Sequence, residues 1–274
     1  MLTRPIPSSG ETLPIVGLGT YRGFDVSLGG GARERLAGVL EALLRAGGTV
    51  IDASPMYGRA EAVAGELLAE AAAREKTFVA TKVWTRGRRQ GTEQMRRSVT
   101  LLRSQVIDLM QVHNLVDWRT HLATLRAWKD EGLVRYLGVT HYTASAFDQL
   151  EAVMRAGPLD FVQLNYSLED RAAEHRLLPL AAERGIAVLV NVPFGGGGLL
   201  RRLARQPLPT WADQIGCASW SQVLLKYVLG HPAVTCAIPG TGQPEHMAAN
   251  ALAGEAPLPD QAIRRRMAAA FDAL

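Results

Sequence analysis

Short runs rich in valine and isoleucine alternate along this chain with longer stretches in which leucine and alanine recur at helical spacing. This alternation is typical of strand–helix units that build a parallel sheet, because each helix covers one face of the sheet before the next strand begins. The strand-like runs number eight and span residues 15–21, 49–54, 77–83, 106–113, 134–141, 159–166, 186–193 and 233–239.

The eight units account for nearly the whole chain. Dividing 274 residues by eight gives about 34 residues per unit, and a closed barrel of eight strands and eight helices takes about 250 residues. No linker rich in proline and serine divides the chain. The sequence therefore predicts an α/β fold, a (β/α)8 TIM barrel in a single domain over residues 1–274.

Two segments lie outside the eight units. Residues 1–14 contain three prolines and a glycine, which suit a short hairpin closing the bottom of the barrel better than a helix. Residues 194–217 include the four successive glycines Gly195 to Gly198. They predict a long loop that is mobile until a cofactor orders it, because glycines are costly to immobilise.

The composition excludes several classes of protein. No run approaches the roughly 18 to 20 apolar residues of a membrane span, and the N-terminus lacks the pattern of a secretion signal, so we expect a cytoplasmic protein. The net charge of +4 is too small to indicate a nucleic-acid partner. Two cysteines and no Cys/His cluster predict neither a disulfide framework nor a metal site. The oligomeric state stays open.

Polar side chains that can handle protons fall near the ends of three consecutive predicted strands. They are Asp52 with the nearby Tyr57, then Lys82, then His113, about one strand–helix unit apart. In such barrels the working face lies at the C-terminal ends of the strands. Any one of these residues alone is more often structural. Together they predict a catalytic set, because ionisable groups in a barrel mouth cost desolvation energy unless they are paired or used.

The four residue types suit proton transfer to a carbonyl oxygen. An ammonium beside Tyr57 favours the phenolate, so we expect Lys82 to lower the pKa of this tyrosine. Asp52 keeps Lys82 charged and in place. His113 then donates a hydrogen bond to the substrate oxygen while Tyr57 gives it a proton.

Six segments, in chain order, resemble the aldo-keto reductase family: GLGTY (17–21), DASPMYG (52–58), ATKVW (80–84), DLMQVHN (108–114), FVQLNYS (161–167) and IPGTGQPEHMAAN (238–250). The resemblance implies an eight-stranded barrel, a nicotinamide cofactor across its mouth, no metal, and reversible carbonyl reduction. It also implies that Tyr57 is the general acid, that Lys82 and Asp52 lower its pKa, and that His113 orients the carbonyl.

The resemblance places the cofactor on the rim of the barrel. Thr140 and His141 stand where many members have a Ser-Asn pair that binds the carboxamide, and Gln163 matches its second partner. Asn191 stands where the family often has a stacking tyrosine, for which Phe194 is a substitute. The full set of expected cofactor-binding residues is Gly19, Thr20, Tyr21, Asp52, Thr140, His141, Gln163, Asn191, Pro193, Phe194, Gly195, Leu199, Ile238, Gly240, Thr241, His246 and Asn250.

The phosphate end departs from the family pattern. Members that use NADPH usually carry two basic residues where this chain has Gly240 and His246. Either Arg201, Arg202 or Arg205 supplies the missing charge, or these arginines form a solvated helix face. NADPH is the expected cofactor, with NADH possible.

The resemblance also suggests an apolar, aromatic substrate pocket for aldehydes or ketones of medium size. The chain after residue 250 is short, which predicts an open pocket and broad specificity, and Arg264 to Arg266 are expected on a solvated helix face. The expected substrate-binding residues are Tyr21, Met56, Trp84, His113 and Asn114.

The sequence therefore predicts an NADPH-preferring oxidoreductase that reduces aldehydes or ketones to alcohols, with Tyr57 as general acid and a small-molecule carbonyl compound as its partner. Two alternatives stay open: a sugar or alcohol dehydrogenase working in the oxidative direction, and a nicotinamide-binding regulatory subunit with little turnover. A metal-dependent hydrolase is disfavoured, because no His-x-His pair or carboxylate cluster lies at the strand ends.

Overall fold

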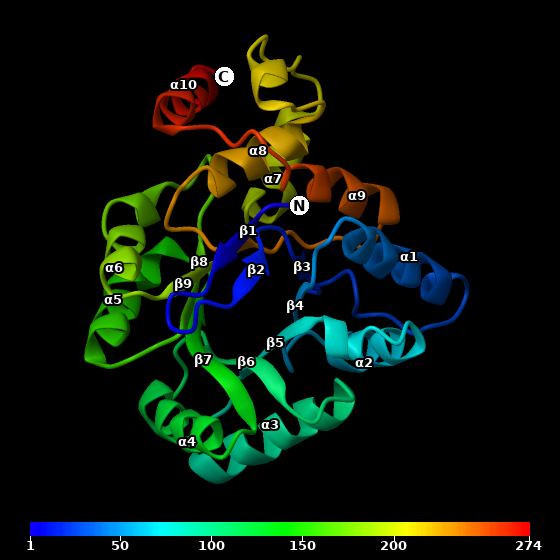
Figure 1. Ribbon diagram of the computed structural model, residues 1–274, viewed down its shortest axis with the longest axis vertical. Coiled ribbons are helices and arrows are strands. Elements are labelled where there is room, and N and C mark those ends of the chain that lie inside the picture. Colours follow the sequence, from blue (N-terminus) through cyan, green and yellow to red (C-terminus); the bar gives the residue numbers. More distant parts are fainter.

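A computed structural model describes residues 1–274 and contains a parallel sheet of eight strands (Figure 1). Each strand of this sheet pairs with the strand that follows it in the sequence. All eight predicted strands are present, the two at the ends of the sheet being much shorter than predicted. The strands are β3 (Leu18–Gly19), β4 (Val50–Asp52), β5 (Phe78–Val83), β6 (Ile107–His113), β7 (Val134–His141), β8 (Phe161–Asn165), β9 (Ala187–Asn191) and β10 (Cys236–Ala237).

Two isolated parallel bridges close the sheet into a barrel. They join Val16 to Ala237 and Gly19 to Gly240. The backbones approach so closely that a Cβ atom on Gly19 would lie 2.8 Å from the carbonyl oxygen of Ile238. The predicted (β/α)8 barrel is therefore confirmed, and its seam runs between β3 and β10.

Helices surround the barrel, and most bury one face against it (Figure 1). In α1 the buried residues are Leu36, Val39, Leu40 and Leu43, which the 3.6-residue period places on one stripe. The helices are α1 (Ala32–Arg45), α2 (Ala60–Glu70), α3 (Arg88–Leu101), α4 (Trp118–Asp130), α5 (Phe147–Ala156), α6 (Leu177–Glu183), α7 (Gly198–Leu203), α8 (Trp220–Leu229), α9 (Pro244–Leu252) and α10 (Gln261–Asp272). None is long and apolar enough to cross a membrane. The last helix, α10, lies outside this ring, beyond α8 (Figure 1).

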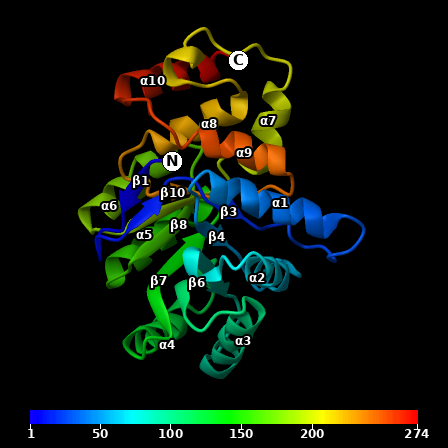
Figure 2. The ribbon, with the colours of Figure 1, turned by 45° about the vertical axis from the view of Figure 1, so that its right-hand side comes forward.

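An antiparallel hairpin closes the bottom of the barrel, as predicted. Its strands are β1 (Thr3–Pro5) and β2 (Thr12–Pro14). Figure 1 shows the hairpin across the ring of strands, and the turned view of Figure 2 shows it at one side of them. Ile6 and Leu13 of the hairpin are buried in one cluster with inward-facing strand residues such as Phe78 and Phe161. The lower half of the barrel is thus filled with apolar side chains, which leaves only the upper end for chemistry.

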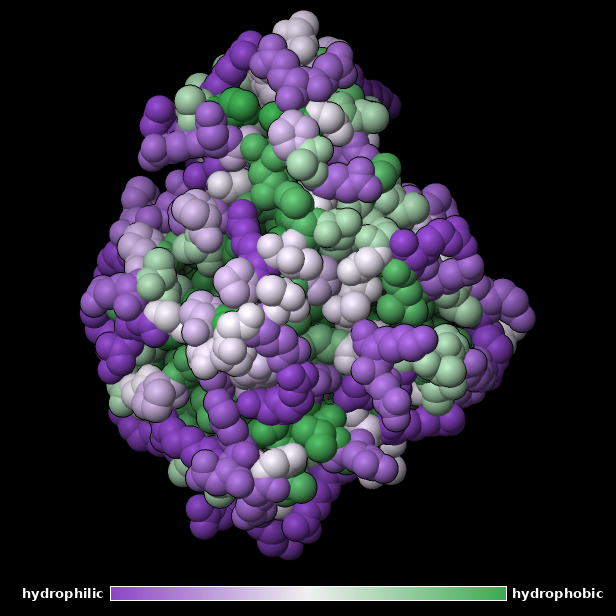
Figure 3. All heavy atoms as spheres, viewed as in Figure 1, coloured by the Kyte–Doolittle hydropathy of each residue, from purple (hydrophilic) through white to green (hydrophobic).

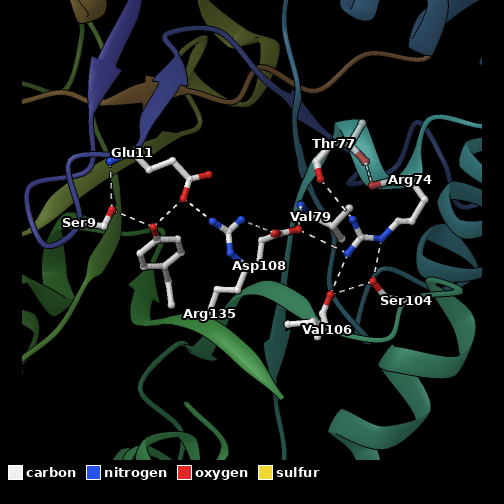
Figure 4. A network of polar contacts seen from close by, with 10 residues as sticks. Ser9, Glu11, Arg74, Thr77, Val79, Ser104, Val106, Asp108 and Arg135 are labelled. Carbon is white, nitrogen blue, oxygen red and sulfur yellow. Dashed lines mark hydrogen bonds and ion pairs between the residues drawn. The ribbon is translucent and has the colours of Figure 1, made fainter. Parts of the chain in front are cut away.

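Polar contacts tie the hairpin to the barrel (Figure 4). Glu11 accepts a hydrogen bond from the Tyr136 hydroxyl (2.6 Å) and forms an ion pair with Arg135. Arg135 also donates to Asp108 (2.8 Å), whose other oxygen accepts the backbone N–H of Val79 (2.8 Å). This series of polar contacts links the hairpin to β7, β6 and β5. Ion pairs and hydrogen bonds therefore hold the bottom of the barrel together with apolar packing.

The predicted long loop over 194–217 is more regular than expected. It contains α7 and two short 3-10 helices, Gly195–Gly197 and Ala212–Ile215. Gly195, Gly196 and Gly197 all have positive φ, a conformation that costs glycine little. The buried side chains of Leu199 and Leu203 anchor the segment to the core, which explains how four glycines are held in place.

The expectation that Arg264 to Arg266 all lie on a solvated face is wrong for the first of them. Arg264 is buried and donates to Glu174 (2.5 Å) and to the backbone oxygen of Tyr227 (3.1 Å). Its neighbours Arg265 and Arg266 are exposed. Because the helical period is 3.6 residues, one arginine of three consecutive ones falls on the buried stripe of α10.

Hydrophilic residues dominate the rim of the hairpin face (Figure 3). Apolar residues show between them nearer the middle of this face. The four catalytic candidates lie at the opposite end of the barrel, at or next to the C-terminal ends of β4, β5 and β6.

Candidate active site

The upper half of the barrel is lined by polar side chains in place of apolar ones. Parallel pairing sets Lys82 beside Gln111, His113 beside Thr140, and Thr140 beside Gln163. Alternate residues of a strand face the same side, so the polar residues stand directly above the apolar cluster of the lower half. Desolvated polar groups of this kind must pair with one another or with a ligand.

A buried ion pair lies at the centre of this layer. Lys82 Nζ donates to Asp52 Oδ2 (2.6 Å) and to the backbone oxygen of Ala53 (2.8 Å), and the Lys82 side chain is completely buried. Burial alone lowers the pKa of Lys82, but the nearby Asp52 and Tyr57 outweigh it, so this pKa lies above its ordinary value. The ammonium therefore stays charged at neutral pH.

Tyr57 lies over this pair, on the loop after β4. Lys82 Nζ is 5.0 Å from the centre of the Tyr57 ring. The expected lowering of the Tyr57 pKa is wrong in its net direction: burial raises this pKa above its ordinary value, and the charge of Lys82 only opposes the rise. The phenol is therefore protonated at neutral pH, and Lys82 limits the cost of its ionisation.

His113 completes the set from the end of β6. Its ring meets the Tyr57 ring edge-on at 5.8 Å and 88°, and Nδ1 lies 3.0 Å from Ser54 Oγ. Burial, and then the charge of Lys82, lower the pKa of His113 to about 2. The imidazole is therefore neutral and acts as a hydrogen-bond donor or acceptor, never as a cation, at ordinary pH.

A network of amides links the ion pair to the predicted carboxamide site. Gln163 donates to Asp52 Oδ1 (2.8 Å) and accepts from Thr140 Oγ1 (3.1 Å). Asn191 Nδ2 lies 3.4 Å from Gln163 Oε1, while the Asn191 Oδ1 atom is buried without a partner. A buried acceptor without a donor beside a threonine and a glutamine fits the amide group of a nicotinamide.

His141 is half-buried at the end of β7. Its ring stacks on Tyr142 at 5.6 Å and 2°, and Nδ1 accepts a hydrogen bond from the backbone N–H of Thr143 (3.3 Å). Burial lowers the pKa of His141. With Nδ1 as acceptor, Nε2 carries the proton and is available as a hydrogen-bond donor.

At the predicted phosphate end, the backbone at Gly23 lies very close to the backbone at Thr241. A Cβ atom on Gly23 would lie 2.8 Å from the Thr241 carbonyl oxygen. Gly240 is exposed, and α9 begins shortly after it at Pro244. A turn of this kind at a helix start suits a phosphate, and Arg35 Nη1 donates to the Gly242 carbonyl oxygen (2.5 Å), which brings a guanidinium beside it.

The remaining predicted cofactor residues differ in how accessible they are. His246 is exposed, whereas the Asn250 side chain is only 3% exposed. Arg202, one of the three loop arginines, donates to Glu169 (3.0 Å) and lies 4.3 Å over the Phe271 ring. Six of the predicted residues are buried: Gly19, Thr20, Pro193, Phe194, Leu199 and Ile238.

Exposed apolar side chains surround the catalytic set. Tyr21, Met56 and Trp84 are 52%, 37% and 42% exposed. The Tyr21 ring lies 5.0 Å from the Tyr57 ring, and the Trp84 ring lies 6.4 Å from that of His113. Large apolar groups left open to water around a polar centre are typical of a ligand site.

Two residues of this site were not among those predicted. Gln111 Nε2 lies 3.4 Å from Asp52 Oδ1, and Ser54 contacts His113. The strand period contains the signal for both, because Gln111 stands two positions before His113 and Ser54 two positions after Asp52. Both contacts join residues 59 positions apart.

Comparisons with known proteins agree with the resemblance that the motifs indicate. The model of the Aldo/keto reductase family matches residues 15–270. Methylglyoxal reductase YeaE of Escherichia coli (strain K12) is 30% identical over 260 residues, or 92% of this chain and 89% of that protein. The NADH-specific methylglyoxal reductase of the same organism is 30% identical over 241 residues, or 75% of this chain and 71% of that protein.

Solved structures agree with these matches. An aldo/keto reductase from Klebsiella pneumoniae in complex with NADP and acetate has a TM-score of 0.79 at 25% identity, over 94% of this chain and 92% of that one. Another from the same organism, in complex with NADPH, has a TM-score of 0.83 at 23% identity, over 99% of this chain and 96% of that one. The second likeness shows that the barrel fold is shared.

Proposed function

Since the chain belongs to the aldo/keto reductase family and is an NAD(P)-dependent oxidoreductase, we propose that it reduces small aldehydes or ketones to alcohols with Tyr57 as the general acid. The observation that carries this proposal is the buried Lys82–Asp52 pair (2.6 Å) beneath the Tyr57 ring. A structural ion pair has no need of a tyrosine and a neutral histidine at its open side.

The catalytic residues divide the reaction between them. A reduced nicotinamide, when bound, supplies a hydride to the carbonyl carbon. Tyr57 donates its phenolic proton to the carbonyl oxygen, and Lys82 stabilises the phenolate left behind. Asp52 holds Lys82 in place, and His113 donates a hydrogen bond to the oxygen on which charge develops. Water restores the proton to Tyr57, whose ring is partly exposed.

The protonated state of Tyr57 readies the site for a reductive turnover, while the equilibrium and the ratio of reduced to oxidised cofactor decide between this direction and the oxidative alternative. A phenol that burial keeps protonated at neutral pH is ready to give a proton, whereas oxidation of an alcohol requires the phenolate as a base. The same groups run the reaction backwards only when the phenol has ionised.

The relatives and the mouth of the barrel support small carbonyl compounds as the substrate class. Two relatives at 30% identity are named methylglyoxal reductases, and the open apolar rim around Tyr21, Met56 and Trp84 suits small carbonyl compounds. Oxidation of reduced cofactor, followed by absorbance, is measured with methylglyoxal and with a panel of aldehydes, ketones and sugars. Turnover of several aldehydes is expected. Tight cofactor binding without turnover of any carbonyl compound would instead identify a regulatory subunit.

NADPH is the proposed preferred cofactor. The turn at Gly240 to Gln243, the start of α9 and the guanidinium of Arg35 offer positive potential for a phosphate. Arg201 in α7 and Arg205 just after this helix are exposed and form no ion pair, so their charge is free to attract a phosphate. The ratio of kcat/KM for NADPH and NADH tests this, and equal values or a preference for NADH contradict it.

A further inference from the structure

Ser54 is a buried hydroxyl between two residues of the catalytic set. It follows Asp52 by two positions and precedes Tyr57 by three, and it has no exposed surface. Its Oγ atom has two partners, His113 Nδ1 at 3.0 Å and the backbone N–H of Met56 at 3.3 Å. None of the steps assigned above to Asp52, Tyr57 and Lys82 uses this side chain.

The positions of the protons follow from these two contacts. The Met56 N–H can only donate, so Ser54 Oγ is the acceptor of that bond. The hydroxyl proton of Ser54 then has a single acceptor within reach, His113 Nδ1. A ring nitrogen that accepts a hydrogen bond is unprotonated, and a neutral imidazole carries its one proton on the other nitrogen, Nε2.

The opposite tautomer leaves a group unsatisfied. With a proton on Nδ1, His113 would donate to Ser54 Oγ, and the Ser54 hydroxyl proton would have no acceptor in a buried position. The ring has only one proton to place, because burial keeps the pKa of His113 at about 2. Nε2 has no protein partner and is not among the buried polar atoms that lack one, so solvent reaches it in the mouth of the barrel.

We propose that Ser54 is a positioning residue that holds His113 in the Nε2–H tautomer and so presents a hydrogen-bond donor to the oxygen of a carbonyl substrate. The inference rests on the proposed carbonyl reduction for its effect on turnover. The tautomer itself is a property of the chain alone, and it is measured without substrate or turnover.

Nuclear magnetic resonance of the protein labelled with 15N at its six histidines measures the tautomer. The His113 signals are those missing from the spectrum of His113→Asn. In the wild type we expect an unprotonated Nδ1 and a protonated Nε2. In Ser54→Ala we expect the second tautomer to become populated, and in Ser54→Thr, which keeps a hydroxyl, the wild-type pattern. A protonated Nδ1 in the wild type overturns the proposal.

Kinetics supply the second readout. Ser54→Ala is expected to lower kcat for an aldehyde about tenfold, part of the roughly 10²- to 10⁴-fold that such groups contribute, with the Kd for NADPH unchanged. Ser54→Thr is expected to recover most of the rate. The matched control is Ser167→Ala, because Ser167 is also buried and accepts a backbone N–H (3.0 Å, from Asp170) but contacts no histidine.

The outcomes separate this inference from the proposed function. If the wild type turns over substrate and Ser54→Ala changes neither the tautomer nor the rate, the role of Ser54 is contradicted and the proposed function is not. Absence of turnover in the wild type contradicts the proposed function, while the spectrum still decides the tautomer. A loss of cofactor binding in Ser54→Ala equal to its loss of kcat marks a merely structural role and also overturns the proposal.

Discussion

Lys82 is completely buried and charged, and its environment explains the division of labour among its neighbours. Asp52 compensates the buried ammonium through a 2.6 Å contact. The same ammonium opposes the rise of the Tyr57 pKa and lowers that of His113. One cation thus assists ionisation of the proton donor and adds to burial, the larger cause, in keeping the hydrogen-bond donor neutral, which suits two neighbouring groups to different tasks.

Replacement of the proton donor tests the assignment most directly. Tyr57→Phe removes only the hydroxyl, so kcat for an aldehyde is expected to fall by roughly 10²- to 10⁴-fold, with the Kd for NADPH unchanged. Tyr136→Phe is the control, since its hydroxyl is hydrogen-bonded at the bottom of the barrel, and its kcat should match that of the wild type. Near-normal turnover in Tyr57→Phe would remove Tyr57 from the reaction.

The pH dependence follows from the two pKa shifts. Reduction needs the protonated phenol, and the Tyr57 pKa lies above its ordinary value of 10.0, so the rate falls only as pH rises past that value. His113 has a pKa of about 2 and does not titrate on the acid side at ordinary pH. For reduction, kcat/KM is therefore expected to be flat between about pH 5 and 9. A limb near pH 6.5 that His113→Asn abolishes would contradict this.

Among the residues, titratable groups at the strand ends could be predicted from the sequence better than the residues that orient them. The Asp52, Tyr57, Lys82 and His113 set is brought together as predicted. The role of Ser54 depends on which atom of a distant strand it meets, and spacing along one strand does not contain that information. The net direction of the Tyr57 pKa was also missed, because burial outweighs the charge of Lys82 and burial depends on the packed barrel.

The helices show the same division between pattern and packing. The buried stripe of α1 follows its hydrophobic period, whereas α10 contains a buried arginine that a hydrophobic pattern cannot detect. Glu174, which lies outside this helix, supplies the carboxylate that compensates the charge of the buried Arg264. Likewise α7 was missed because the glycines before it and at its first position predict a loop. The burial of Leu199 and Leu203, which anchor it, depends on the folded core.

Removing the buried arginine tests how α10 is held. Arg264→Ala leaves the partly buried Glu174 carboxylate without its positive partner, although the Tyr166 and Tyr227 hydroxyls still donate to it. We expect the free energy of unfolding to fall by about 3 kcal/mol, the lower end of the scale for breaking a buried ion pair. Arg265→Ala is the matched control on the exposed side of the same helix, expected within about 0.5 kcal/mol of the wild type. Chemical denaturation measures both, and equal effects would show that the ion pair does not hold the helix.

The glycine segment before α7 is expected to respond to cofactor. Three of its residues have positive φ and two, Gly195 and Gly196, are exposed, so only the anchor at Leu199 and Leu203 restrains the glycines without a ligand. Trypsin is expected to cleave at the exposed Arg201 or Arg205 more slowly when NADPH is bound. The cleavage rate, followed by mass spectrometry, measures this. The same rate with and without NADPH would show that the segment does not contact the cofactor.

On the scale of the whole molecule, the repeated strand–helix units predict the barrel, and close backbone contact between β3 and β10 closes it. Eight alternating units indicate the fold because each needs a neighbour to cover its apolar face. The seam is different, since β3 and β10 have only two residues each and two isolated bridges join the strand ends. No side-chain pattern marks that junction, which explains why the strands flanking it were predicted too long.

We expect the stability of the closed barrel to depend on the close backbone contact at this seam. Gly19→Ala places a Cβ atom 2.8 Å from the Ile238 carbonyl oxygen, so the two strand ends must move apart. We expect the free energy of unfolding to fall by roughly 2 to 3 kcal/mol, as for other overpacked sites. Gly29→Ala is the control, because a Cβ atom there meets nothing within 4 Å. Chemical denaturation of both variants measures the difference, and equal stabilities would mean that the seam yields without cost, so that backbone contact between β3 and β10 does not hold the barrel closed.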